Sequence, residues 1–268
     1  MFDLLAINPT AFHLGPIPIQ WYGILITTGI ILAFIVVQKE MVKRGMHPDF
    51  LTDLLIWAVP ISIVSARIYY VVFSWSSYKD TPADVFKIWE GGIAIHGALI
   101  GAFLTTYIYT KRRGISFWKV ADIAAPGILI GQIIGRWGNF INQEAHGGPV
   151  SEKFLENTII PDWIMNQMTK DGVTYHPTFL YESLWNLVGL VIILLLRKVM
   201  LKRGEMFLFY LTWYSIGRYF IEGMRTDSLY GGDLRAAQIV SILTIIVAVS
   251  LFIYRRYIQK VNVHYQDK

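Results

Sequence analysis

Seven continuous apolar stretches run along the chain and are separated by short polar segments. A bilayer core is about 30 Å thick, so one spanning helix needs about 20 predominantly apolar residues. The runs are continuous and do not alternate, a pattern that predicts helices and not barrel strands. We therefore predict an all-α integral membrane protein with seven transmembrane helices, within Ile19–Val37, Leu54–Phe73, Gly92–Thr110, Val120–Phe140, Thr178–Leu196, Met206–Ile221 and Ala236–Tyr254.

The basic residues predict how these helices are oriented. Most of the 24 Lys and Arg residues lie after the first, third and fifth stretches or in the C-terminal tail. Because cytoplasmic loops carry the excess of Lys and Arg, the N-terminus is expected outside and the C-terminus in the cytoplasm. Residues 141–177 then form a long extracytoplasmic loop between helices 4 and 5. We expect a single membrane-embedded domain over residues 1–268.

Composition supports the membrane assignment and removes several function classes. Charged residues make up 16% of the chain, against about 25% in soluble domains. The absence of cysteine excludes a thiol nucleophile, a disulfide framework and a Cys-ligated metal. The basic clusters between apolar stretches account for the net charge of +5, so we expect no nucleic-acid partner. No His and carboxylate cluster has ligand spacing, and we expect no metal.

Five polar residues within the predicted spans point to one side of the membrane. With the orientation above, Arg67, Arg136 and Arg218 lie towards the outer ends of their helices, and Tyr22 and His96 near the outer starts of theirs. Charges inside membrane helices are costly and are by default functional candidates. Simpler interpretations stay open: Arg67 either snorkels to the headgroups or is functional, Tyr22 fits an aromatic belt, and His96 fits a polar contact between helices.

Arg136 and Arg218 are the strongest candidates of this set. Each stands beside glycine, and acids follow closely at Glu144 and Glu222. Function is favoured over structural ion pairs, because guanidinium groups bind phosphate oxygens in a bidentate manner. A phosphate at the depth of the outer leaflet is most simply a phospholipid headgroup. The residues themselves therefore indicate a protein that modifies or binds lipid.

The most specific segment is G-R-W-G-N-F-I-N-Q-E-A-H-G, at Gly135–Gly147. It supplies the cation Arg136, the carboxamides Asn139 and Asn142, and the carboxylate Glu144 where a helix leaves the bilayer. If the helix continues, Arg136 and Asn139 are i,i+3 neighbours on one face.

This segment resembles the signature of the phosphatidylglycerol–prolipoprotein diacylglyceryl transferase family, and the resemblance covers nearly the whole chain. A mild departure is Ala98, where many members have a second glycine. The resemblance implies a seven-helix fold and a bacterial enzyme of the cytoplasmic membrane, with its active site towards the outer leaflet. It also rests on I-Q-W-Y-G (Ile19–Gly23), A-R-I-Y-Y (Ala66–Tyr70), W-E-G-G-I-A-I-H-G-A-L-I-G (Trp89–Gly101), H-P-T-F-L-Y-E (His176–Glu182) and G-R-Y-F-I-E-G-M-R-T-D (Gly217–Asp227).

The family reaction implies the partners. Such enzymes move the diacylglyceryl group of phosphatidylglycerol to the lipobox cysteine in the signal-peptide region of a prolipoprotein, and glycerol phosphate leaves. This is the first step of lipoprotein maturation. The partners expected are therefore phosphatidylglycerol, the prolipoprotein and membrane lipid, without a cofactor.

A hypothesis for the site assigns roles to these residues. Arg136 and Arg218 hold the phosphate and stabilise its developing charge. His96 is the leading base, since its ordinary pKa of about 6.5 suits proton transfer, and Glu144 is the rival. Headgroup binding is assigned to Tyr22, Asn139, Asn142 and Gly147, and supporting roles to Arg67, Tyr214, Glu222 and Arg225. His146 and His176 are weaker candidates, and His13 and His264 are taken as surface residues.

Two other function classes are weighed against this one. A transporter is the strongest alternative, but the sequence has no internal repeat and no pair of broken helices in corresponding halves. A retinal photoreceptor needs a buried Schiff-base lysine, and no span interior contains one. A peptide receptor fits the composition but does not explain the two arginines.

Overall fold

The structure is a computed structural model that describes residues 7–199, 201–226, 230–231 and 234–267. Its contacts divide the chain into two compact units. The first contains residues up to Val37 and from Asp122 onward, and the second is Gln38–Ala121. Each unit is described below by itself. The prediction of a single domain stays a prediction.

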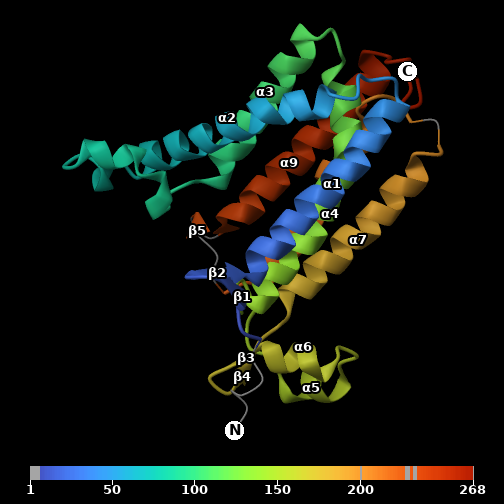
Figure 1. Ribbon diagram of the computed structural model, residues 1–268. Coiled ribbons are helices and arrows are strands. Elements are labelled where there is room, and N and C mark those ends of the chain that lie inside the picture. Colours follow the sequence, from blue (N-terminus) through green and yellow to red (C-terminus); the bar gives the residue numbers. More distant parts are fainter. Residues whose placement is uncertain (1–6, 200, 227–229, 232–233, 268) are drawn as a thin grey trace. The chain divides into compact units, whose positions relative to one another are not determined.

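Seven long helices occupy the seven predicted stretches (Figure 1). The first begins at Trp21, later than predicted, because Ile19 lies in a strand, and it runs on through a polar end to Lys43. The fifth matches its prediction residue for residue. The helices are α1 (Trp21–Lys43), α2 (Phe50–Phe73), α3 (Ile95–Arg112), α4 (Phe117–Ile141), α7 (Thr178–Leu196), α8 (Glu205–Met224) and α9 (Ala236–Ile253), the last followed by the π-helical turn η5 (Tyr254–Ile258).

Five of these helices are long and apolar enough to cross a membrane: α1, α2, α4, α7 and α9 with its π-helical turn. The other two are of sufficient length but more polar. Helix α3 ends in Lys111 and Arg112, and α8 contains Glu205, Arg218 and Glu222. The mostly helical architecture is therefore confirmed and includes five candidate spans, while the seven-span count and the orientation stay predictions.

Glycine allows close packing of α1 on α4 in the first unit, where the two helices run side by side (Figure 1). A Cβ atom placed on Gly29 would lie 3.5 Å from the Cα atom of Gly131. Helix α7 joins this pair through the Ser183 hydroxyl, which donates to the Ile133 carbonyl at 3.2 Å. The C-terminal half of α4 is thereby in contact with both α1 and α7.

A reciprocal tryptophan pair joins α7 to α8. The rings of Trp185 and Trp213 stack with centroids 4.3 Å apart. Each indole N–H donates to the other residue's carbonyl, at 2.8 and 2.9 Å. Gly189 and Gly217 lie beneath these rings, where a Cβ atom would overlap the indole carbons. This contact fixes the register between the helices that carry Glu182 and Arg218.

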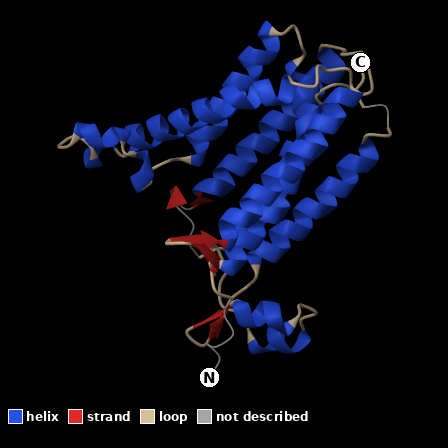
Figure 2. Cartoon of the chain, in the orientation of Figure 1, coloured by secondary structure: helices blue, strands red, loops and turns tan. Residues whose placement is uncertain are grey.

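The predicted loop over residues 141–177 contains structure of its own. Its apolar residues pack on the end of α4, in a core formed by Phe140, Ile164, Met168 and Phe179. All three short hairpins of the described chain belong to the first unit (Figure 2). The loop contains α5 (Glu152–Asn157), α6 (Asp162–Gln167), β3 (Thr169–Lys170) and β4 (Val173–Thr174), and the other strands are β1 (Thr10–Leu14), β2 (Ile17–Gln20), β5 (Tyr230–Gly231) and β6 (Leu234–Arg235).

The second unit is built on a hairpin of α2 and α3. Gly101 lies against Ser65, since a Cβ atom there would stand 2.7 Å from the Ser65 hydroxyl. The connection between the two helices contains three 3-10 turns: η2 (Trp75–Ser77), η3 (Pro82–Phe86) and η4 (Ile88–Glu90).

Candidate functional site

Two arginines and two glutamates from three helices form an ion cluster in the first unit. Arg136 of α4 contacts Glu182 of α7, with Nη2 and Oε1 2.6 Å apart. Arg218 of α8 lies on the same carboxylate, with Nη1 3.6 Å from Oε2, and its Nη2 is 2.7 Å from Glu222 Oε2. One carboxylate therefore bridges both arginines, and the four formal charges cancel.

The acids of this cluster are more deeply buried than the bases. The side chains of Glu182 and Glu222 are 4% and 5% exposed, while those of Arg136 and Arg218 are 21% and 19% exposed. Buried charges persist when they are paired, and this arrangement pairs both acids. Arg218 Nη1 makes no hydrogen bond within the described residues, although it faces Glu182. Arg218 Nη1 is thus an unused donor that is itself buried within the cluster.

A second polar chain begins on the other side of Arg136. Its Nη1 lies 3.5 Å from Asn139 Oδ1, one turn further along α4. The Asn139 amide donates to Glu144 at 3.0 Å, and the Asn142 amide donates to the same oxygen at 3.4 Å. Four predicted residues are therefore brought together here, and Arg136 lies between Glu182 and the group formed by Asn139, Asn142 and Glu144.

Tyr22 and Tyr214 approach the same part of α4. The Tyr22 ring lies on Gly138, where any Cβ atom would overlap it, so α1 reaches the residue next to Asn139. Tyr214, one turn before Arg218 on α8, interacts with Arg136 through its hydroxyl. The Tyr214 hydroxyl and the Tyr22 ring thus lie against the part of α4 that carries Arg136 and Asn139.

Backbone pairing ties the segment after α4 to the start of α7 and the end of α8. Gly147 donates to the His176 carbonyl at 3.0 Å and forms a β-bridge with Arg225. A Cβ atom at Gly147 would stand 2.8 Å from His176 Cβ, so glycine allows the close approach. Arg225 thus lies beside Gly147 through its backbone.

The two histidines of this region face aromatic rings. His146 lies 4.2 Å from the Tyr175 ring and His176 lies 4.8 Å from Phe154, centroid to centroid. Burial lowers the pKa of His176 from its usual value of 6.5. Its Nδ1 is 3.2 Å from the Tyr181 hydroxyl. The contacts of His176 with Phe154 and Tyr181 therefore involve neither arginine of the ion cluster.

Comparison with known proteins identifies the family. The family model described as prolipoprotein diacylglyceryl transferase matches residues 9–254. The chain belongs to this family. A phosphatidylglycerol–prolipoprotein diacylglyceryl transferase of Lysinibacillus sphaericus is 66% identical over 267 residues, covering 98% of both chains. Proteins of the same name from Bacillus velezensis and Listeria monocytogenes are 60% and 51% identical, over 93% and 98% of this chain and 93% and 95% of theirs.

In this member of the diacylglyceryl transferase family, Glu182 is the central residue that the sequence analysis missed. It was quoted within H-P-T-F-L-Y-E but given no role. A signal was present, because Glu182 is an acid inside the apolar stretch Thr178–Leu196. Charges within membrane spans are functional candidates whatever their sign, so the criterion that selects the arginines selects Glu182 as well.

His96 belongs to the second unit, at the start of α3. It is exposed there, and its ring lies 6.0 Å from that of Tyr69. The predicted meeting of His96 with Arg136 therefore stays a prediction. The transferase motif that ends at Asp227 also extends beyond the described residues.

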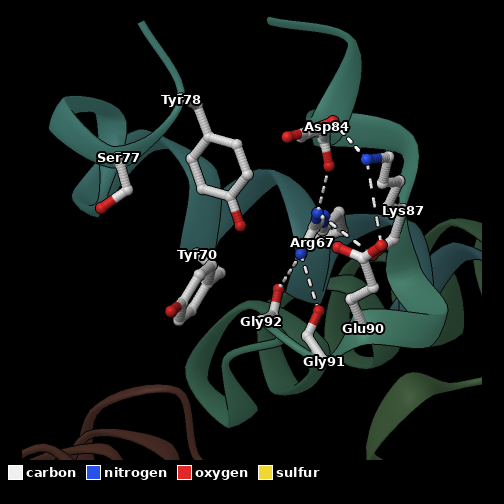
Figure 3. Close-up of a pocket in the computed structure, with 9 residues that line it drawn as sticks. All are labelled: Arg67, Tyr70, Ser77, Tyr78, Asp84, Lys87, Glu90, Gly91 and Gly92. Carbon is white, nitrogen blue, oxygen red and sulfur yellow. Dashed lines mark hydrogen bonds and ion pairs between the residues drawn. The ribbon is translucent and has the colours of Figure 1, made fainter. Parts of the chain in front are cut away.

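Arg67 organises the connection between α2 and α3 in the second unit. The residue is 7% exposed and donates to the carbonyls of Val85, Gly91 and Gly92 at 2.8 Å and of Asp84 at 2.7 Å. Figure 3 shows its guanidinium group beside Asp84, Gly91 and Gly92, at the lining of a cavity of about 210 Å³. In the same turn, the Lys87 ammonium lies 2.7 Å from Asp84 and lowers the pKa of that carboxyl group. Arg67 thus stabilises the fold of the segment between α2 and α3.

Proposed function

We propose that this chain transfers the diacylglyceryl group of phosphatidylglycerol to the lipobox cysteine of prolipoproteins, with release of glycerol phosphate. The observation that carries the proposal is the pair Arg136 and Arg218, which share the buried carboxylate of Glu182. Family membership supports it, because relatives of this name match nearly the whole chain. The enzyme is then a transferase that acts on one lipid and one protein substrate.

The chemistry requires an anion site and a proton acceptor. The cysteine sulfur attacks the glycerol carbon that bears the phosphate, a C–S bond forms, and the C–O bond to phosphate breaks. Charge develops on the departing glycerol phosphate, where Arg136 and Arg218 stabilise it. Arginine suits this role because its planar fork matches phosphate oxygens.

The remaining residues are assigned to headgroup binding and proton transfer. Asn139, Asn142 and Tyr22 supply hydrogen bonds to the headgroup, and Gly147 lets the backbone come close. The thiol proton passes to His96 or to Glu144, because the thiolate is the nucleophile. Glu144 already accepts from both asparagines, which orients its carboxylate.

Supporting roles go to residues that hold this arrangement. Glu222 pairs with Arg218, and Tyr214 interacts with Arg136. Arg225 lies beside Gly147 in a β-bridge, and Arg67 shapes the connection after α2.

The proposal places seven helices in the bacterial cytoplasmic membrane, with the N-terminus outside and the site towards the outer leaflet. Because the sequence has no cysteine, single cysteines can be placed and labelled without background. Ser151→Cys, in the long loop, should react with an impermeant maleimide in intact cells. Lys111→Cys, after α3, should react only once the membrane is opened. The reverse pattern would invert the orientation.

The activity test uses purified protein, phosphatidylglycerol and a peptide with a lipobox cysteine. Mass spectrometry should find a diacylglyceryl group on the peptide and glycerol phosphate in solution, with no gain on a Cys→Ser peptide. Arg136→Ala should abolish the gain, while Arg113→Ala, a surface arginine paired with Asp53, should keep it. No gain with folded wild-type protein and bound lipid would contradict the proposal and favour lipid binding or transport.

A further inference from the structure

Two glutamines connect the end of α4 to the end of α6, directly beside the proposed site. The Gln167 amide donates to the carbonyls of Phe140 and Ile141 at 3.3 and 3.2 Å, in the last turn of α4. In return, the Gln143 amide donates to the Gln167 carbonyl at 2.7 Å, at the last residue of α6. Each glutamine thus satisfies carbonyls that the other helix end leaves without an intrahelical partner.

Gln167 is buried to a degree that is unusual for its residue type. It is 1% exposed, and its side-chain oxygen accepts from the backbone N–H of Ile7 at 2.7 Å. Buried polar groups are costly unless hydrogen-bonded, and both ends of this amide have partners. Breaking the contact would remove the side-chain donor from the Ile141 carbonyl, while the Phe140 carbonyl would keep the Gln143 backbone N–H at 3.2 Å.

The backbone around Glu144, next to Gln143, is held in a conformation that L-residues rarely adopt. Gln143 and Ala145 have φ angles of 51° and 57°, in the left-handed region. Such non-glycine residues cost free energy and persist where the surroundings hold them. The side chain of Gln143 supplies one restraint, and the Thr178 hydroxyl supplies the other by donating to the Ala145 carbonyl at 2.6 Å.

Glu144 is the residue between these two positions. Its backbone N–H donates to the Asn139 carbonyl at 3.0 Å, and its carboxylate accepts from Asn139 and Asn142. A change of φ at Gln143 or Ala145 would turn the Glu144 side chain away from these amides. The path from Gln167 to Arg136 therefore runs through Gln143, Glu144 and Asn139.

We propose that Gln143 and Gln167 form a positioning clasp that holds Glu144, and through it Asn139, in the geometry required for diacylglyceryl transfer. The proposal rests on the proposed function and adds two positioning residues to it. The clasp acts on the orientation of Glu144, and the phosphate contacts of Arg218 lie outside its reach.

The test compares kcat and KM for phosphatidylglycerol in purified variants. Gln167→Met keeps the approximate volume of the side chain and removes its two donated hydrogen bonds and the one that it accepts from Ile7. Gln143→Gly removes the hydrogen bond to the Gln167 carbonyl, and glycine adopts the left-handed backbone conformation of this position without steric strain. Each should lower kcat about tenfold with KM changed less than about twofold, a fall that corresponds to about 1.4 kcal/mol. Asn157→Ala is the control in the same loop. It removes an exposed hydrogen bond from the Asn157 side-chain amide to the Lys153 carbonyl and should leave kcat and KM unchanged.

A double-mutant cycle separates positioning from general stability. In the Glu144→Gln background, Gln167→Met should cause no further fall in kcat, because its effect passes through Glu144. Equal losses in both backgrounds would overturn the clasp, and so would a wild-type kcat in both Gln167→Met and Gln143→Gly. If Gln167→Met does not fold, Gln143→Gly is carried through the same cycle.

The two proposals fail in different ways. Wild-type protein that never modifies the peptide contradicts the transferase assignment itself. Active wild-type protein whose rate is indifferent to both glutamines contradicts only the clasp.

Discussion

Replacing Glu182 by glutamine should disable the enzyme more through orientation than through loss of lipid affinity. The variant keeps the side chain's size and removes the charge that both arginines share. The lost contacts are the 2.6 Å ion pair with Arg136 and the longer 3.6 Å contact with Arg218. Removing one partner of a buried ion pair costs about 3–5 kcal/mol. Because both arginines are partly exposed and the second contact is long, we take a loss of about 2–4 kcal/mol.

That loss has two measurable consequences. At about 1.4 kcal/mol per decade, kcat should fall about 30- to 1,000-fold if the contact energy is needed to orient Arg136. KM for phosphatidylglycerol should not rise, because Arg136 and Arg218 both stay and one competing anion is gone. The melting temperature should also fall, since Glu182 is buried and its removal leaves two nearby guanidinium groups without their shared partner.

The assay is peptide modification followed by mass spectrometry, with thermal unfolding of the same preparations in detergent. Glu156→Gln, an exposed acid in α5, is the matched control and should behave as wild type. A Glu182→Gln variant with unchanged kcat and melting temperature would refute the reasoning. A large rise in KM with unchanged kcat would show that Glu182 acts in lipid binding instead.

Three further predictions each concern one residue. Gly138→Ala should lower kcat/KM at least about tenfold, because its methyl group displaces the Tyr22 ring; a wild-type value would separate Tyr22 from the site. Arg67→Lys should speed amide hydrogen exchange in residues 74–94, because one ammonium group cannot reach all the carbonyls that the guanidinium group binds. Unchanged exchange would contradict this role of Arg67. The lowered pKa of His176 means that the unfolded state binds a proton at this residue more tightly than the folded state does. Stability should therefore fall as the pH drops below about 6.5 and through the folded-state pKa. In His176→Gln, the melting temperature should change less between pH 7.5 and 5 than it does in the wild type.

The helices could be predicted from the sequence because membrane spans are long, continuous and apolar. Thr178–Leu196 shows this most directly, since Pro177 precedes it and Arg197 and Lys198 follow it, so that both limits are marked. The start of α1 was misplaced because Ile19 is as apolar in strand β2 as it would be in a helix. The polar extension of α1 to Lys43 was missed because apolar length does not report where a helix ends in water.

The site could be predicted only as far as local patterns reach. Arg136, Asn139 and Glu144 lie within nine residues, and a helix through the first two places them together. The partnership of Arg136 with Glu182 joins residues that are 46 positions apart and depends on how α4 packs on α7. No periodicity in the sequence carries that information.

The charge balance of the cluster bears on how it could receive a phosphate. Arg136, Arg218, Glu182 and Glu222 together carry no net charge, so long-range attraction does not draw an anion to them. Selectivity then depends on the donors that the carboxylates leave unused. Arg218 Nη1 has no hydrogen bond within the described chain, and Arg136 Nη1 lies 3.5 Å from Asn139. Because Arg218 Nη1 is buried, a phosphate would have to displace its neighbours to reach that atom, while Glu182 and Glu222 continue to hold other sides of the guanidinium groups.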